Sequence, residues 1–367
     1  MPRMSAVRAM FAIVVIALSL FAGRVAGAML SGVGGDSRAS RATTQRAASQ
    51  QAAAASRARA PAPTSSSASR PASVLGKDRA AAGAQAQLRM LLTLLLVCVL
   101  EAIAVALSLS SARRRGARLA ATFMLVLLGI VTVQPQIEAA YFGVISLRAE
   151  LRLLMMGAVV AAIVAPVAVF TLGLWRKRDE PLAAAATIPF VTRLWIQRAS
   201  LCAVVYLALY LTFGYWIAWR DPIVREYYGG AAPEGFIQHL GWLTTQRADL
   251  LVLQLARGVL WTGIGLLVLG SQRPARAWNA VTLGILFAAL MNAQLLLPNA
   301  AMPHHVRMVH LLETAPSNFL MGVLVALAFG RRTPSRPSGR GPRDADTDVP
   351  CDGSDEAGAA ALERIRC

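Results

Sequence analysis

Seven long apolar stretches constrain the fold of this chain more than any other feature. A helix of about 20 residues crosses the hydrocarbon layer of a bilayer, which is about 30 Å thick. Only a helix satisfies its own backbone hydrogen bonds within a single segment in lipid. We therefore predict an all-α polytopic transmembrane helix bundle with seven core spans. The spans cover about residues 90–111, 119–141, 153–175, 200–219, 250–270, 278–297 and 309–330.

Composition excludes an ordinary soluble protein. Of the 367 residues, 56% are hydrophobic and 15% are charged, whereas soluble domains carry about 25% charged residues. The formal net charge of +18 is compatible with nucleic-acid binding, but the chain shows no nucleic-acid-binding motif. Basic residues instead collect beside the spans, as expected for residues that orient a membrane protein. We expect a lipid bilayer as partner and no nucleic acid.

The two ends of the chain differ from the region of the spans. A short apolar run between Arg8 and Arg24 is followed by Ala26-Gly27-Ala28, which fits either a cleaved signal peptide or an uncleaved anchor helix. Two other segments have low-complexity, polar composition and little to bury. The predicted regions are a signal peptide or signal anchor at 1–28, a disordered Ala/Ser/Arg/Pro linker at 29–88, the seven-helix domain at 89–330 and a disordered cytoplasmic tail at 331–367.

Arginine distribution predicts the orientation of the bundle. The loops after the first, third and fifth spans hold eleven basic residues, whereas the opposite loops hold six. Because basic loops stay in the cytoplasm, the core enters from outside and the C-terminus is cytoplasmic. Only two of the 37 basic residues are lysines, a bias that suggests a GC-rich, bacterial genome. The expected location is thus a bacterial inner membrane.

Polar side chains within the spans fall mainly in the predicted outer half of the membrane. Such residues are costly in lipid, so they usually face the bundle interior and often mark function. We predict a polar cavity there, open to the outside, with Glu101 as its floor. It would bind a small polar or anionic solute or a lipid headgroup. The candidate ligand-binding residues are Arg257, Glu313, His310, Ser317, Asn318, Glu138, Glu101, Asn292 and Gln294.

The last span carries the sharpest pattern. His310, Glu313, Thr314 and Ser317 have the spacing of one helix face. Pro316 lies among them and removes a donor to a backbone carbonyl. The face either binds a ligand or forms an interhelical hydrogen-bond network that only holds the bundle together.

Arg257 needs a negative partner at its depth in the membrane. Glu313, Glu101 and Glu138 are the candidates. The residue is part of either an anion-binding site or a structural ion pair.

A metal site is a weaker prediction. His305, His310 and Glu313 are residue types that bind zinc, but their spacing matches no HExxH or paired-cysteine pattern. The sequence identifies no cofactor. It excludes a retinal Schiff base, because no lysine lies in the middle of a span.

Three sequence segments resemble those of uncharacterised multi-pass bacterial inner-membrane proteins. The resemblance covers roughly residues 90–330 and implies no activity. The segments are FGYWIAWRDP with Arg225 and YYGG (213–230), NAQLLLP (292–298) and HLLETA (310–315).

Three functions remain open at this point. The protein binds or transports a small polar or anionic solute, with Arg257, His310 and Glu313 in the site. Alternatively, it is a membrane-embedded hydrolase or transferase for lipid-linked substrates, with Glu313 as general base. As a third possibility, it is a structural membrane subunit without chemistry.

Overall fold

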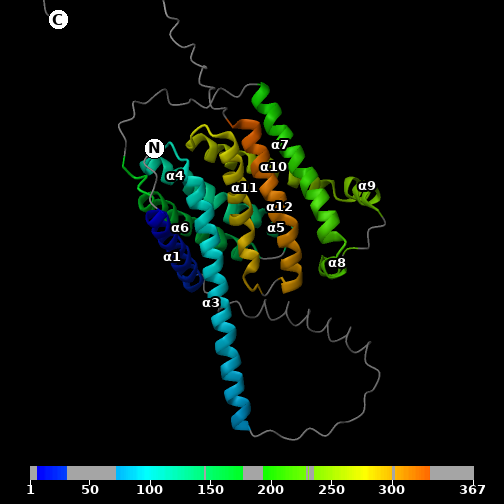
Figure 1. The fold of residues 1–367 in the computed structure, drawn as a ribbon. Helices are drawn as coiled ribbons and strands as arrows, with labels where there is room; N and C mark the ends of the chain where they lie inside the picture. The colour runs from blue at the N-terminus through cyan, green and yellow to red at the C-terminus, as the bar shows by residue number, and fades with distance from the viewer. Residues whose placement is uncertain are drawn as a thin grey trace, which may run out of the picture. The chain divides into compact units, whose positions relative to one another are not determined.

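The computed structural model describes residues 6–30, 72–143, 146–176, 193–228, 230, 235–299 and 302–330. This part of the chain contains helices and no strand, apart from two isolated bridges. Figure 1 shows the helices side by side in a bundle. They are α1 (Ala6–Leu30), α3 (Ala72–Ser110), α4 (Gly116–Leu127), η1 (Leu128–Val133), α5 (Gln134–Tyr141), α6 (Leu147–Thr171), α7 (Arg193–Phe213), η2 (Gly214–Trp219), α8 (Pro222–Tyr228), α9 (Phe236–Gln246), α10 (Ala248–Ser271), α11 (Arg276–Asn292), η3 (Ala293–Leu296) and α12 (His304–Phe329).

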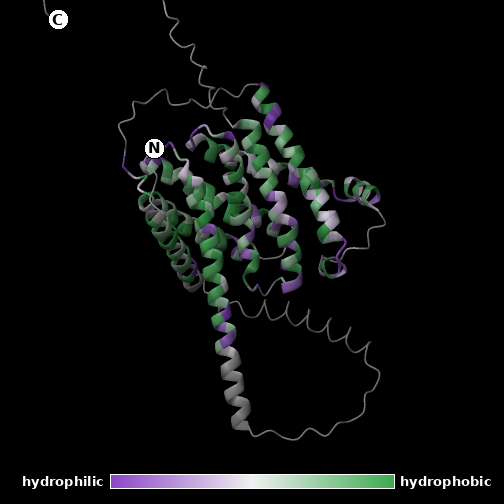
Figure 2. Ribbon diagram, viewed as in Figure 1, coloured by the Kyte–Doolittle hydropathy of each residue, from purple (hydrophilic) through white to green (hydrophobic). Residues whose placement is uncertain are grey.

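Among the described residues, seven helical segments are long and apolar enough to cross a membrane, so the predicted fold class is confirmed. Figure 2 shows hydrophobic residues along most of their length, as contact with hydrocarbon requires. Several helices extend beyond the apolar stretch, because arginine side chains reach toward the membrane surface while the backbone continues its hydrogen bonds. The spans run over Gly83–Ser110, Gly116–Tyr141, Leu147–Thr171, Arg193–Trp219, Ala248–Ser271, Arg276–Leu296 and His304–Phe329.

The regions outside the seven spans are only partly described. Helix α1 covers most of the predicted signal or anchor region at 1–28 and extends two residues past it, to Leu30. Helix α3 begins at Ala72, so helix occupies the end of the segment expected as linker. The rest of that segment, residues 31–71, and the tail at 331–367 lie outside the described residues.

Two spans contain a π-helical segment. The second span runs from α4 through η1 into α5, and the fourth from α7 into η2. A π-helical turn inside an α-helix is rare and often lies at a functional site. Both segments lead into the half of the bundle where the polar residues of the second and fourth spans lie.

The three basic loops meet at one end of the bundle. The Arg113 amide donates to the Ser271 carbonyl over 2.7 Å, and the Gly116 amide donates to the Leu174 carbonyl over 2.9 Å. Gly173 closes α6 with a φ of 69°, a left-handed conformation that glycine adopts without strain. Loops that are distant in sequence therefore share one end, as the arginine distribution requires.

Close helix packing surrounds the polar region. Trp261 and Phe287 are fully buried, and their ring centroids lie 4.5 Å apart. Between α11 and α12, a Cβ atom added to Gly322 would lie 2.6 Å from the Leu283 carbonyl oxygen. Small residues allow such approach between membrane helices, which leaves the polar side chains little freedom to move.

Candidate functional site

Arg257 of α10 lies at the centre of a buried polar cluster. Only 3% of the residue is exposed. Its Nη1 lies 2.9 Å from Oε2 of Glu138 and 3.0 Å from Oε1 of Gln254, and its Nε donates to Oε1 of Gln134 over 3.1 Å. Glu138 is therefore its ion-pair partner, rather than Glu101 or Glu313. The guanidinium is shared by three oxygen acceptors from α5 and α10.

A second chain of contacts crosses from α8 to α12. His310 Nδ1 lies 2.8 Å from Glu313 Oε2, and His310 Nε2 lies 2.8 Å from the Tyr228 hydroxyl. Burial and then the nearby Glu138 charge raise the pKa of Tyr228 well above its ordinary value, so the phenol keeps its proton. With a neutral imidazole, Tyr228 donates to Nε2 and the Nδ1 proton points to Glu313. Hydroxyl, imidazole and carboxylate thus form an ordered relay.

Tyrosines of α7 lie near both groups. Tyr210 lies close enough to Glu138, Glu313 and Arg257 for their charges to act on its hydroxyl. The guanidinium of Arg257 also lies 6.0 Å from the ring centre of Tyr206, a distance at which a cation attracts an aromatic face. We call Gln134, Glu138, Tyr206, Tyr210, Tyr228, Gln254, Arg257, His310 and Glu313 the polar cluster.

Gly214 makes room for the carboxylate of the cluster. It is the first residue of η2, and a Cβ atom added there would lie 3.2 Å from Glu313 Oε1. That distance is tighter than most real Cβ contacts, so any larger residue would push the carboxylate. The start of the π-helical segment therefore lies against the acidic end of the relay.

The cluster occupies one level of the bundle. Arg257 and Glu313 each lie nine residues into their helices, or about 13 Å at 1.5 Å per residue. Glu138 lies three residues before the end of α5. These positions share the half of the bundle opposite the basic loops, where the sequence predicts polar residues.

Several predicted residues lie beside the cluster on α11 and α12. Thr314 Oγ1 lies 2.5 Å from Asn292 Oδ1 and 2.6 Å from the His310 carbonyl oxygen, and its single proton can go to either acceptor. Ser317 donates to the Thr314 carbonyl, and Asn318 is buried. This part of α12 fits the interhelical hydrogen-bond network that was the alternative to a ligand-binding face.

Two predicted residues lie apart from the cluster. Gln294 of η3 donates to the carbonyl of Met291 over 3.1 Å. Glu101 of α3 pairs with Arg24 of α1 at 2.6 Å. Glu101 therefore does not form the floor of the polar cluster in these contacts. Its counter-charge comes from Arg24 of α1 instead.

The three residues of the metal hypothesis have other partners. His305 Nε2 lies 2.8 Å from Asp221 Oδ2, while His310 and Glu313 contact each other. Within the described ranges, no group of three or more His, Cys, Asp and Glu side chains could hold a metal ion. The metal hypothesis gains no support from this geometry.

Asp221 also caps the short helix α8. Its Oδ1 accepts from the amides of Ile223 and Val224 over 2.9 and 3.0 Å. Burial raises the pKa of Asp221, but the hydrogen bonds from His305 and these amides outweigh burial and hold it below its ordinary value. This contact fixes α8, and with it Tyr228, beside the start of α12.

Sequence reasoning missed the tyrosines and Arg24 as partners. Tyr206, Tyr210 and Gly214 follow the i, i+4, i+8 spacing of one helix face, a signal that could have marked the polar face of α7. In the sequence, Arg24 is recognisable only as the flank of an apolar run. Neither Tyr228 nor its contact with His310 has a local signal, because α8 and α12 lie far apart in sequence.

These features define a multi-pass membrane protein with a buried, ionisable cluster among its helices. Comparison with protein families, curated proteins and solved structures finds no match for the sequence. The geometry of the cluster is therefore the basis for functional inference.

Proposed function

We propose that the protein binds, and carries across the membrane, a small polar solute together with a proton, using the polar cluster. The observation that carries this proposal is the grouping of Arg257, Glu138, His310 and Glu313 at one level of the bundle. Ionisable residues are expensive within a membrane, and in transporters they mark proton relays and substrate paths. Tyr228 and His310 provide an ordered route for a proton to Glu313.

The charges of the cluster favour an uncharged or cationic solute over an anion. Arg257 already has Glu138 and two amide oxygens as partners, so an anion would have to displace Glu138. Glu313 adds a second carboxylate, so the cluster is one charge negative while His310 is neutral, and it has no net charge once His310 holds a proton. A proton or a cationic group on the solute would balance that charge.

The cluster also has groups that a solute could contact. The side chain of Glu138 is 33% exposed. Within the described residues, Nε2 of Gln254 is buried and has no hydrogen-bond partner. A buried amide donor without a partner is costly, and an acceptor on a bound solute or water would satisfy it.

Solute-coupled proton movement tests the proposal. The purified protein is placed in liposomes that contain a pH-sensitive dye, and choline, erythritol or phosphate is added outside. We expect choline or erythritol, but not phosphate, to change the internal pH. Glu313→Gln should reduce the initial rate at least tenfold, whereas the exposed control Glu226→Gln should retain it. An internal pH that responds to none of the three solutes would contradict the proposal.

The order of Tyr228, His310 and Glu313 also favours a second candidate, a transferase or hydrolase for lipid-linked substrates. A hydroxyl, a base and an orienting carboxylate in contact are the arrangement of activated nucleophiles. Release of inorganic phosphate from a prenyl diphosphate in detergent would support this candidate. Loss of that release in Tyr228→Phe, with the Glu226→Gln control active, would assign it to the relay.

For membrane topology we propose a bacterial inner membrane with the basic loops and the C-terminus in the cytoplasm. Support comes from the meeting of the arginine-rich loops at one end of the bundle. Reporter fusions test this orientation. A periplasmic reporter should be inactive after Arg115 and active after Glu226, and the reverse result would overturn it.

A further inference from the structure

Helix α1 packs into the bundle as the membrane spans do. Its residues Ala12, Ile16, Ala17 and Leu20 are at most 3% exposed and lie on one face. This face contacts α3 and α6, and Figure 1 shows α1 beside them. The opposite face presents apolar side chains such as Val14, which suit contact with lipid.

An ion pair holds α1 to α3. Arg24 Nη2 lies 2.6 Å from Glu101 Oε1, and Glu101 is fully buried. The Nη1 atom of Arg24 also donates to Cys98 Sγ over 3.7 Å. Removal of α1 would leave the Glu101 carboxylate buried without its cation, which is among the costliest changes to a protein interior.

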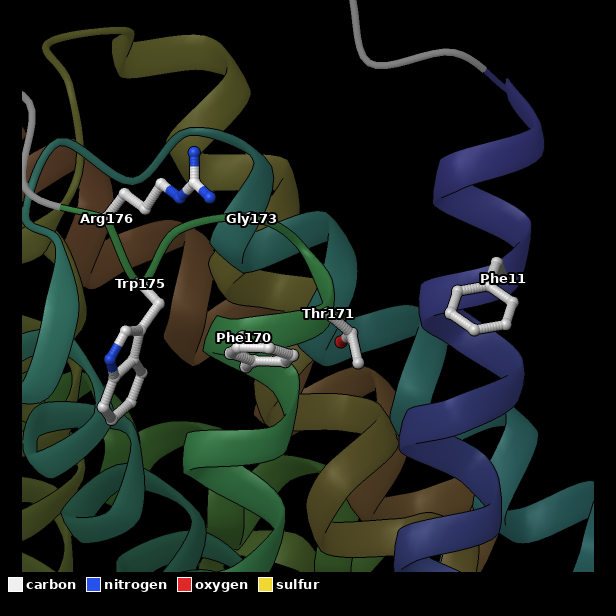
Figure 3. A pocket seen from close by; sticks show the side chains of 6 residues that line it. All are labelled: Phe11, Phe170, Thr171, Gly173, Trp175 and Arg176. Carbon is white, nitrogen blue, oxygen red and sulfur yellow. The ribbon is translucent and has the colours of Figure 1, made fainter.

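The contacts of α1 define its depth relative to α6. Phe11 lines a cavity with Phe170 and Thr171 near the end of α6, as Figure 3 shows. A Cβ atom on Gly23 would lie 3.3 Å from Cγ2 of Val160, well inside α6. The two helices therefore run in opposite directions, and α1 continues from Gly23 toward the start of α6.

The cleavage motif Ala26-Gly27-Ala28 consequently lies within the layer of the spans. Three to five residues beyond Gly23, it falls about 12 to 15 Å inside the start of α6 at 1.5 Å per residue. It is also helical, since α1 extends to Leu30. Proteases cut irregular chain in preference to helix.

We propose that α1 is retained as an eighth membrane-spanning helix, anchored to α3 by the Arg24–Glu101 ion pair. Its 25 residues span about 37 Å, enough to cross the hydrocarbon layer. The apolar run is short because it stops at Arg24, but Glu101 neutralises Arg24 and allows the span to continue past it. This inference does not depend on the solute proposed above.

The N-terminus of the mature protein is the first test. The full chain, carrying a C-terminal tag, is purified from membranes, and its intact mass and N-terminal sequence are measured. The proposal expects residues 1–28 to be present. A mature protein that begins at residue 29 would overturn it, whatever the behaviour of any variant.

Charge exchange tests the anchor itself. Arg24→Leu and Glu101→Gln should each lower the melting temperature in detergent by about 5 °C or more. The double exchange Arg24→Glu with Glu101→Arg should restore at least half of that loss. Arg89→Leu, at an exposed position of α3, is the matched control and should leave the melting temperature unchanged. If Arg24→Leu behaves like Arg89→Leu, the ion pair is not the anchor.

Discussion

Two ion pairs between helices of this protein differ in how completely their charges are matched. Arg24 and Glu101 face each other with 16% and 0% of their side chains exposed, and one cation neutralises one carboxylate. Arg257 and Glu138 belong to the polar cluster, where Glu313 supplies another carboxylate and His310 a titratable imidazole. The first pair has the properties expected of a structural contact between helices. The second lies beside a further carboxylate that can take up a proton.

Exposure reinforces this contrast. Glu138 is one-third exposed, whereas Glu101 is fully buried beside Arg24 of α1. A buried charge pair can serve stability or chemistry, and the pair alone does not distinguish them. The groups beside each pair distinguish a structural role from a chemical one. Proton transfer needs a path of donors and a carboxylate that no cation already neutralises.

The largest effect should come from removal of the central cation. Arg257→Leu leaves Glu138 without its counter-charge and removes the donors to Gln134 and Gln254. We expect a loss of about 3–5 kcal/mol in the free energy of unfolding, as for other broken buried pairs, together with loss of solute-coupled proton movement. Thermal unfolding in detergent measures the first effect. Arg257→Leu with Glu138→Leu should be more stable than Arg257→Leu alone, and an equal or lower stability would argue against the pairing.

Removal of one carboxylate from each region separates the two roles. Glu313→Gln should reduce proton movement at least tenfold while shifting the melting temperature little, because a glutamine oxygen can still accept from His310. Glu101→Gln should have the opposite effects. It should lower the melting temperature of the protein, because it weakens the contact between α1 and α3, and leave proton movement nearly unchanged. The two regions would be equivalent in function if both variants lost proton movement to the same degree.

A matched pair of glycines gives a smaller and more local test. In Gly214→Ala the added Cβ would lie 3.2 Å from Glu313 Oε1, and in Gly23→Ala 3.3 Å from Val160 Cγ2. The first displaces a charged group and should slow proton movement several-fold. In Gly23→Ala the added Cβ meets a methyl group of Val160 that can shift. The rate of proton movement in this variant should therefore stay near that of the unaltered protein. Rates in the same liposome assay compare the two.

The smallest effect concerns the cap of α8 and its pH dependence. The folded-state pKa of Asp221 is held below its ordinary value of 3.8, so this contribution to stability is present above that value. It is lost as pH falls through the lower folded-state pKa. Asp221→Asn should cost about 1 kcal/mol or less at neutral pH. Below pH 3.8 the difference in melting temperature between the variant and the unaltered protein should shrink, and growth of that difference would refute the assignment.

Much of the fold could be predicted from the sequence. The seven spans lie within seven residues of their predicted bounds, since hydrocarbon thickness and the need for internal backbone hydrogen bonds leave few alternatives. Helix ends were less predictable. For example, α6 begins at Leu147 rather than near residue 153, because Arg148 and Arg152 continue the helix without being apolar.

The candidate site was predictable in depth and residue type but not in pairing. His310 and Glu313 lie three residues apart on one helix, and local geometry brings them into contact. Arg257 had three possible carboxylate partners, and helix packing selects Glu138. Tyr228 reaches His310 only because α8 folds against the start of α12, a contact between residues 82 positions apart.

The sequence by itself determined that this chain crosses a membrane repeatedly as helices and that its costly polar groups gather toward one surface. The rule behind this is local, since each segment must satisfy its own backbone in lipid. The tertiary structure decided that Arg24 pairs with Glu101 and that Arg257 pairs with Glu138. Those choices depend on helix order and rotation, which arise from side-chain packing among many similar apolar faces and leave no periodic mark in the sequence.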